Sequence, residues 1–78
     1  MTNIEKYDQV FISAFHTSKQ KLPTLSYQGL DTWDSIGHMK MIATLEETFD
    51  IIIEMDDILD FSSYVKGFKI VEKYGIKL

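Results

Sequence analysis

The chain has 78 residues, of which 45% are hydrophobic, and its formal net charge is −4 at pH 7. This length suits one small domain, near the lower limit at which an apolar core suffices, and excludes a second domain. The lack of cysteine excludes disulfides and thiolate metal sites. No stretch resembles a signal peptide or is long enough to cross a bilayer, so we expect a cytoplasmic protein without membrane insertion.

Charge is unevenly distributed along the chain. Residues 31–60 contain nine of the twelve acidic residues and a single base, Lys40, whereas the remaining segments contain the other seven lysines. An acidic centre repels phosphodiester backbones and anionic surfaces, so we expect no nucleic-acid binding and favour a basic protein partner. The alternative is that these acids only form a solvated surface.

The first predicted element is an amphipathic helix over about residues 3–17. Thr2 and Glu5 have the spacing of a capping box, and apolar residues recur at helical spacing after them. Residues 18–33 lose this periodicity and include Pro23 and Gly29, so we expect a long but ordered loop. Four apolar side chains are expected to hold this loop on the core: Leu22, Leu25, Leu30 and Trp33.

The second predicted helix covers about residues 35–49. Ser35 is placed to cap its free backbone N–H groups, and Asp34 lies close to the positive end of the helix dipole. The apolar residues form two stripes, a core stripe of Met41, Ile42, Leu45 and Phe49 and a second stripe of Ile36, Met39 and Ala43. The second stripe indicates either a surface for a partner or a deeply buried helix.

The rest of the chain predicts helices and no sheet. Residues 51–53 are three isoleucines, but no second strand is available to pair with them, so we interpret them as an extended connection that fills the core. Residues 55–59 favour a short helical turn, and a last helix follows Ser62 and Ser63 and ends near Gly75. The predicted fold class is therefore all-α, with three long helices and one short helix.

Ser35 and His38 are one helical turn apart and could suggest a hydrolase. The chain lacks the Gly-x-Ser-x-Gly elbow, however, and is too small to shield a substrate from water. No metal site is predicted, because His16 and His38 lack ligand spacing, and both are interpreted as surface histidines. What remains is a serine hydroxyl at a helix start, either a simple N-cap or a site where a modifying enzyme attaches a phosphate-bearing group.

The run from Trp33 to Met39, Trp-Asp-Ser-Ile-Gly-His-Met, resembles the Asp-Ser-Leu attachment motif of acyl carrier proteins, in the form found in stand-alone and modular carriers. The resemblance extends over essentially the whole chain. It includes the chain length, the first helix, the long loop and four later features: Leu45-Glu46-Glu47, Phe49-Asp50 with Ile53, Asp56-Asp57, and Phe61-Ser62-Ser63.

This resemblance implies one acyl carrier domain over residues 1–78, folded as an acyl-carrier-protein-like bundle. It implies that Ser35 carries 4′-phosphopantetheine, transferred from coenzyme A by a phosphopantetheinyl transferase with magnesium, and that Asp34 supports the transfer. The arm would carry an acyl or aminoacyl group as a thioester, since the chain has no thiol of its own. The protein would then be a monomeric, non-catalytic carrier and not an enzyme.

The resemblance also implies a surface that meets basic, partly apolar faces of acyl-loading and acyl-processing enzymes. Five residues fall on it: Ile36, Met39, Glu46, Glu47 and Asp56. Some residues depart from the family pattern, notably Ile36 in place of leucine, Met55 where many fatty-acid carriers have proline, and the base Lys40. These departures favour a specialised biosynthetic pathway, and the alternative is an unmodified helical interaction module that keeps the carrier fold.

Overall fold

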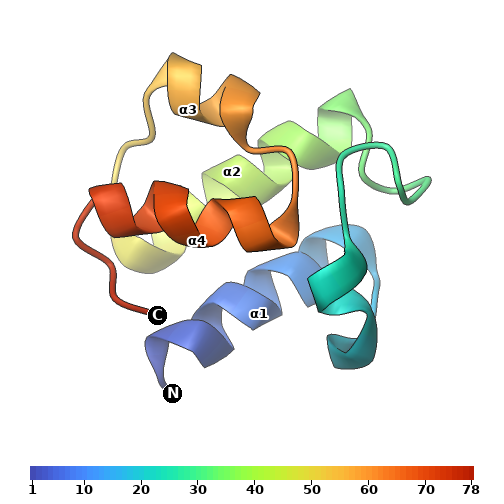
Figure 1. The fold of residues 1–78 in the computed structure, drawn as a ribbon, viewed down its shortest axis with the longest axis horizontal. Helices are drawn as coiled ribbons and strands as arrows, with labels where there is room; N and C mark the ends of the chain where they lie inside the picture. Colours follow the sequence, from blue (N-terminus) through green and yellow to red (C-terminus); the bar gives the residue numbers. More distant parts are fainter.

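Five helices and no strand make up the computed structural model, which describes all of residues 1–78 (Figure 1). In chain order they are α1 (Asn3–Phe15), the 3-10 helix η1 (Lys19–Thr24), α2 (Ser35–Phe49), α3 (Met55–Asp60) and α4 (Tyr64–Lys73). The prediction of an all-α fold is confirmed. The 3-10 helix was not predicted, and the first helix ends two residues earlier than expected.

Side-chain caps explain where the helices begin. The predicted capping box of α1 is present, since Thr2 Oγ1 accepts the Glu5 N–H at 3.3 Å and the Glu5 carboxylate accepts the Thr2 N–H at 2.9 Å. At the start of α4, Ser63 Oγ accepts the Lys66 N–H at 3.0 Å. The first helix ends at Phe15, because the next residue, His16, has a left-handed backbone with a φ of 54° and caps the helix.

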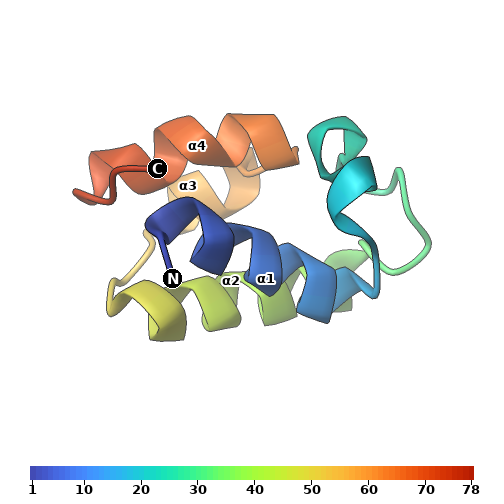
Figure 2. The same cartoon turned by 90° about the horizontal axis from the view of Figure 1, so that it is seen from below.

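The helices enclose one aromatic core. Figure 2 shows α1 and α2 running alongside each other, with α4 above them in this view. Figure 1 shows α3 above α2 and α4 and joined to each of them by a short connection. The largest fully buried side chains come from α1, from the loop and from the segment after α3: Trp33, Tyr7, Phe11, Phe15 and Phe61.

A polar contact fastens α1 to α4 inside this core. Asp8 is 7% exposed and accepts a short hydrogen bond from the Tyr64 hydroxyl. The Tyr7 hydroxyl in turn donates to the Tyr64 carbonyl at 2.7 Å. Burial raises the pKa of both tyrosines, so these hydroxyl groups stay protonated and able to donate.

The loop between α1 and α2 is ordered, as predicted, and η1 forms part of it. Its side chains at Leu22, Leu25 and Trp33 are buried, and Leu30 is half-buried. Two backbone hydrogen bonds fasten the loop to the start of α4, from Tyr27 N–H to the Ser62 carbonyl at 2.8 Å and from Tyr64 N–H to the Leu25 carbonyl at 3.1 Å. The loop therefore has a defined path toward α2.

The three isoleucines after α2 form an extended connection, as predicted, but only part of it fills the core. Ile53 is buried and Ile51 is half-buried, whereas Ile52 is 83% exposed. An extended backbone alternates its side chains, so the middle residue points away from the core that its neighbours contact. None of the five helices combines the length and the apolar character needed to cross a membrane.

Candidate functional site

Asp34, and not Ser35, is the N-cap of α2. Asp34 Oδ1 accepts the Gly37 N–H at 2.8 Å, and the Asp34 backbone has the extended conformation typical of a cap. The prediction that Ser35 caps the helix is wrong, because Ser35 is already the first helical residue. Ser35 is exposed, and its hydroxyl makes none of the hydrogen bonds of the structure. This oxygen is therefore free to react.

A glycine brings the loop tightly against the first turn of α2. Gly37 is buried, and a Cβ atom added there would lie only 2.0 Å from the Thr32 carbonyl oxygen. Thr32 is also bonded to the end of α1, because its hydroxyl donates to the Phe15 carbonyl at 2.8 Å. The end of α1, the loop and the start of α2 thus form one support for Asp34 and Ser35.

Ser35 is one of the residues that line a groove between α2 and α3. The groove has a volume of about 320 Å³. Its polar side chains are Ser35, His38 and Ser62. Its apolar lining comes from the loop, from α2, and from α3 with the residue after it: Tyr27, Met39, Met55, Ile58, Leu59 and Phe61. A free hydroxyl and an apolar groove therefore occupy the same place on the surface.

The second apolar stripe of α2 faces solvent. Ile36 is 80% exposed, Met39 is 50% exposed and Ala43 is also exposed. The alternative that this helix is deeply buried is therefore wrong. The core stripe is confirmed at Met41, Ile42 and Leu45, while Phe49 is half-buried.

The three acidic residues predicted to meet a partner differ in their surroundings. Glu47 on α2 and Asp56 on α3 are exposed. Glu46 is half-buried, and its Oε2 accepts the Ile53 N–H at 2.8 Å. Its carboxylate thus holds the connection after α2 in place, which sets it apart from the two free acids.

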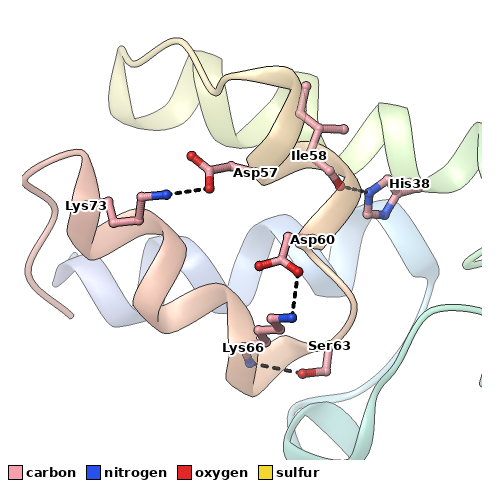
Figure 3. Close-up of polar contacts among 7 residues, drawn as sticks. All are labelled: His38, Asp57, Ile58, Asp60, Ser63, Lys66 and Lys73. Carbon is pink, nitrogen blue, oxygen red and sulfur yellow. Dashed lines mark hydrogen bonds and ion pairs between the residues drawn. The ribbon is translucent and has the colours of Figure 1, made fainter.

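His38 is not the surface histidine that the sequence suggested. It is half-buried, its Nδ1 accepts the Trp33 indole N–H at 2.9 Å, and its Nε2 lies 2.7 Å from the Ile58 carbonyl oxygen (Figure 3). Both ring nitrogens are therefore engaged, and neither is free to take the Ser35 proton. This geometry argues against a serine–histidine hydrolase. His16 is exposed at the end of α1, in agreement with the prediction.

Asp57 was grouped with Asp56 in the sequence but has a different role. It is 7% exposed, and its carboxylate accepts hydrogen bonds from Lys73 Nζ at 2.6 Å and from the Tyr74 hydroxyl at 2.5 Å. These two donors, Lys73 most strongly, hold the pKa of Asp57 below its usual range. Figure 3 shows the Asp57–Lys73 pair joining α3 to α4, with the exposed pair of Asp60 and Lys66 nearby.

Comparison of the chain with models of known protein families, with curated proteins and with solved structures gave no match. The described side chains include no group of three or more His, Asp or Glu residues placed to hold a metal ion. The chemistry of this surface is therefore argued from Ser35, the groove and the residues around them.

Proposed function

We propose that this protein is an acyl carrier whose Ser35 hydroxyl is modified with 4′-phosphopantetheine. One observation supports this above all others. Asp34 caps α2, which leaves Ser35 exposed, with its hydroxyl free of hydrogen bonds, in the lining of a mainly apolar groove. A serine that only capped its helix would have its oxygen engaged by a backbone N–H.

The residues around Ser35 suit a phosphodiester. Ser35 lies in the first turn of a helix of 15 residues, whose N-terminal N–H groups favour anionic oxygen. In the transfer, the Ser35 oxygen would form a new bond to the phosphorus next to pantetheine, and the phosphoanhydride bond of coenzyme A would break. Adenosine 3′,5′-bisphosphate would leave, and the serine proton would pass to a base of the transferase or to water. Asp34 would hold the first turn in place for this step.

The bound arm would supply the thiol that this cysteine-free chain lacks, on which an acyl or aminoacyl group can be carried. The protein itself would be recognised by the partner enzymes and would partly shield the carried group from water. The groove beside Ser35 is lined mainly by apolar side chains and could cover an apolar part of the carried group. The departures at Ile36, Lys40 and Met55 support a carrier of a specialised pathway.

The surface around the groove suits basic, partly apolar enzyme partners. Ile36 and Met39 are exposed apolar side chains on α2, and Glu47 and Asp56 are exposed acids on α2 and α3. Apolar contacts with a charged surround are typical of protein interfaces, and the charges favour rapid encounter with a basic partner. The transferase would be the first such partner.

Incubation with a broad-specificity phosphopantetheinyl transferase, magnesium and coenzyme A tests the proposal. Intact-mass spectrometry should show the addition of one phosphopantetheine group to the wild type and to Ser62→Ala, which alters another serine of the same groove. The Ser35→Ala variant should remain unmodified. If the wild type stays unmodified while a known carrier is modified in the same mixture, the second candidate, an unmodified interaction module with the same exposed face, is favoured instead.

A further inference from the structure

We propose that His38 is a positioning residue that joins the loop tryptophan Trp33 to α3 and so holds α3 against α2 along the groove. The proposal rests on the two bonds of the His38 ring, to Trp33 at 2.9 Å and to the Ile58 carbonyl at 2.7 Å. It goes beyond the carrier function and holds whether or not Ser35 is modified.

The two bonds determine which ring nitrogen carries the proton. The indole Nε1 of Trp33 can only donate, so His38 Nδ1 must accept and carries no hydrogen. The Ile58 carbonyl can only accept, so His38 Nε2 must carry the proton and donate. One neutral tautomer, with the hydrogen on Nε2, satisfies both partners at once.

Packing around the ring keeps it in this orientation. The planes of the His38 and Trp33 rings are nearly parallel, at 18° to each other. The Trp33 ring also stacks on the Phe15 ring, with 4.6 Å between the ring centroids. Tyr27 and Phe61 contact the His38 ring edge-on, with centroids at 5.4 and 6.3 Å. A continuous path of contacts thus leads from the end of α1 through Trp33 and His38 to α3.

The short helix α3 needs such a contact. It has only six residues, and helices of this length are not stable without tertiary packing. Only Asp57 and Ile58 of α3 are buried, whereas Met55 and Leu59 are 65% and 75% exposed. Little apolar area therefore attaches α3 to the rest of the molecule, and its position depends strongly on polar contacts.

The polar contacts of α3 are directed to two helices. Asp57 and Asp60 bond to Lys73 and Lys66 of α4, whereas the bond from His38 is the only hydrogen bond between α2 and α3 (Figure 3). The groove lies between these same two helices, and His38 contributes to its lining. Loss of the His38 bond should therefore loosen the α3 wall of the groove while α3 stays attached to α4.

Three substitutions separate the two bonds. The amide of His38→Asn places its oxygen near the original Nδ1 and can still accept from Trp33, while that of His38→Gln reaches the original Nε2 and can still donate to Ile58. His38→Leu keeps an apolar side chain but makes neither bond. Hydrogen exchange measured by NMR on the Trp33 indole N–H and on the Ile58 and Phe61 amides reports each side separately.

We expect His38→Gln to speed exchange of the Trp33 indole about fivefold or more with α3 nearly unchanged, His38→Asn to do the reverse, and His38→Leu to do both. The proposal is overturned if His38→Leu leaves both sites unchanged, or if the Asn and Gln variants behave alike. Ring ¹⁵N shifts of the wild type at about pH 8, where an ordinary histidine is neutral, give an independent test. They should show the hydrogen on Nε2, and a hydrogen on Nδ1 would refute the proposal even if the variants fail to fold.

Discussion

Asp57 and Lys73 face each other between α3 and α4, with Lys73 Nζ 2.6 Å from Asp57 Oδ1. The Asp57 side chain is only 11% exposed, whereas that of Lys73 is 61% exposed. The Tyr74 hydroxyl completes the contact, since it donates to Asp57 and accepts the Glu54 N–H at 2.9 Å. A single carboxylate therefore connects α3, the segment before it and the end of α4.

This contact predicts a specific loss of stability in acid. The pKa of Asp57 is lowered in the folded protein by Lys73 and then by Tyr74, relative to the usual value of about 3.9. Its contribution to stability is therefore complete above about pH 4 and is lost as the pH falls through the lower, folded-state pKa. The free energy of unfolding, measured with urea at pH values from neutral to strongly acidic, should fall less steeply with decreasing pH for Asp57→Asn than for the wild type.

The exposed neighbour provides the control for this experiment. Asp56→Asn removes the same charge from the same helix without touching Lys73 or Tyr74. Its free energy of unfolding should fall with decreasing pH as steeply as that of the wild type. If Asp57→Asn keeps the wild-type slope, the contact does not stabilise the folded state in the way described.

The second prediction concerns Gly37 at the start of α2. Gly37→Ala should lower the free energy of unfolding by about 1–3 kcal/mol, because the new Cβ would overlap the Thr32 carbonyl, a backbone atom that cannot rotate away. Helix propensity alone would give the opposite sign, a gain of about 1 kcal/mol. Ser13→Ala, at an exposed position of α1, is the control and should leave stability unchanged or slightly raised. A stabilised Gly37→Ala protein would show that the loop does not press on this turn.

The third prediction separates the two apolar stripes of α2. Met39→Glu should change the free energy of unfolding by no more than about 0.5 kcal/mol, because Met39 is half exposed. Met41→Glu should prevent stable folding, because Met41 is fully buried and a lone carboxylate there has no partner. Thermal unfolding followed by circular dichroism measures both. An equally large loss in Met39→Glu would mean that the exposed stripe packs in the core.

The sequence predicted the helices well, because the signals for them are local. Each capping side chain lies within three residues of the backbone N–H group to which it bonds or of the helix that it begins. These residues are Thr2 and Glu5 at α1, Asp34 at α2 and Ser63 at α4. The identity of one cap was still wrong. Asp34 and Ser35 are both good capping residues, and only the backbone conformation shows which of them is outside the helix.

The contacts between distant segments could not be predicted in the same way. His38 bonds to a carbonyl 20 residues away, and Asp57 bonds to a lysine 16 residues away. Neither partner carries a sequence signal, because every residue has a carbonyl and lysines are spread over both ends of the chain. The bond from the Ile53 amide to Glu46 was not predicted for the same reason, since it depends on how the chain turns after α2.

The fourth prediction concerns the exposed acids. Glu47→Lys should slow the modification of Ser35 by the transferase, and the effect should shrink at high salt, because exposed charges are screened over about 8 Å at physiological ionic strength. Glu72→Lys makes the same change of charge on α4 and should have a smaller effect. Initial rates at low and high salt measure this. Equal slowing at both salt levels would exclude electrostatic steering by Glu47.

The intact mass of the protein purified from its native host tests the central proposal most directly. The carrier function predicts that much of the protein carries one phosphopantetheine group, and that fragmentation places it on Ser35. A protein that is entirely unmodified at Ser35, while its own pathway is active in the same cells, would contradict the proposal.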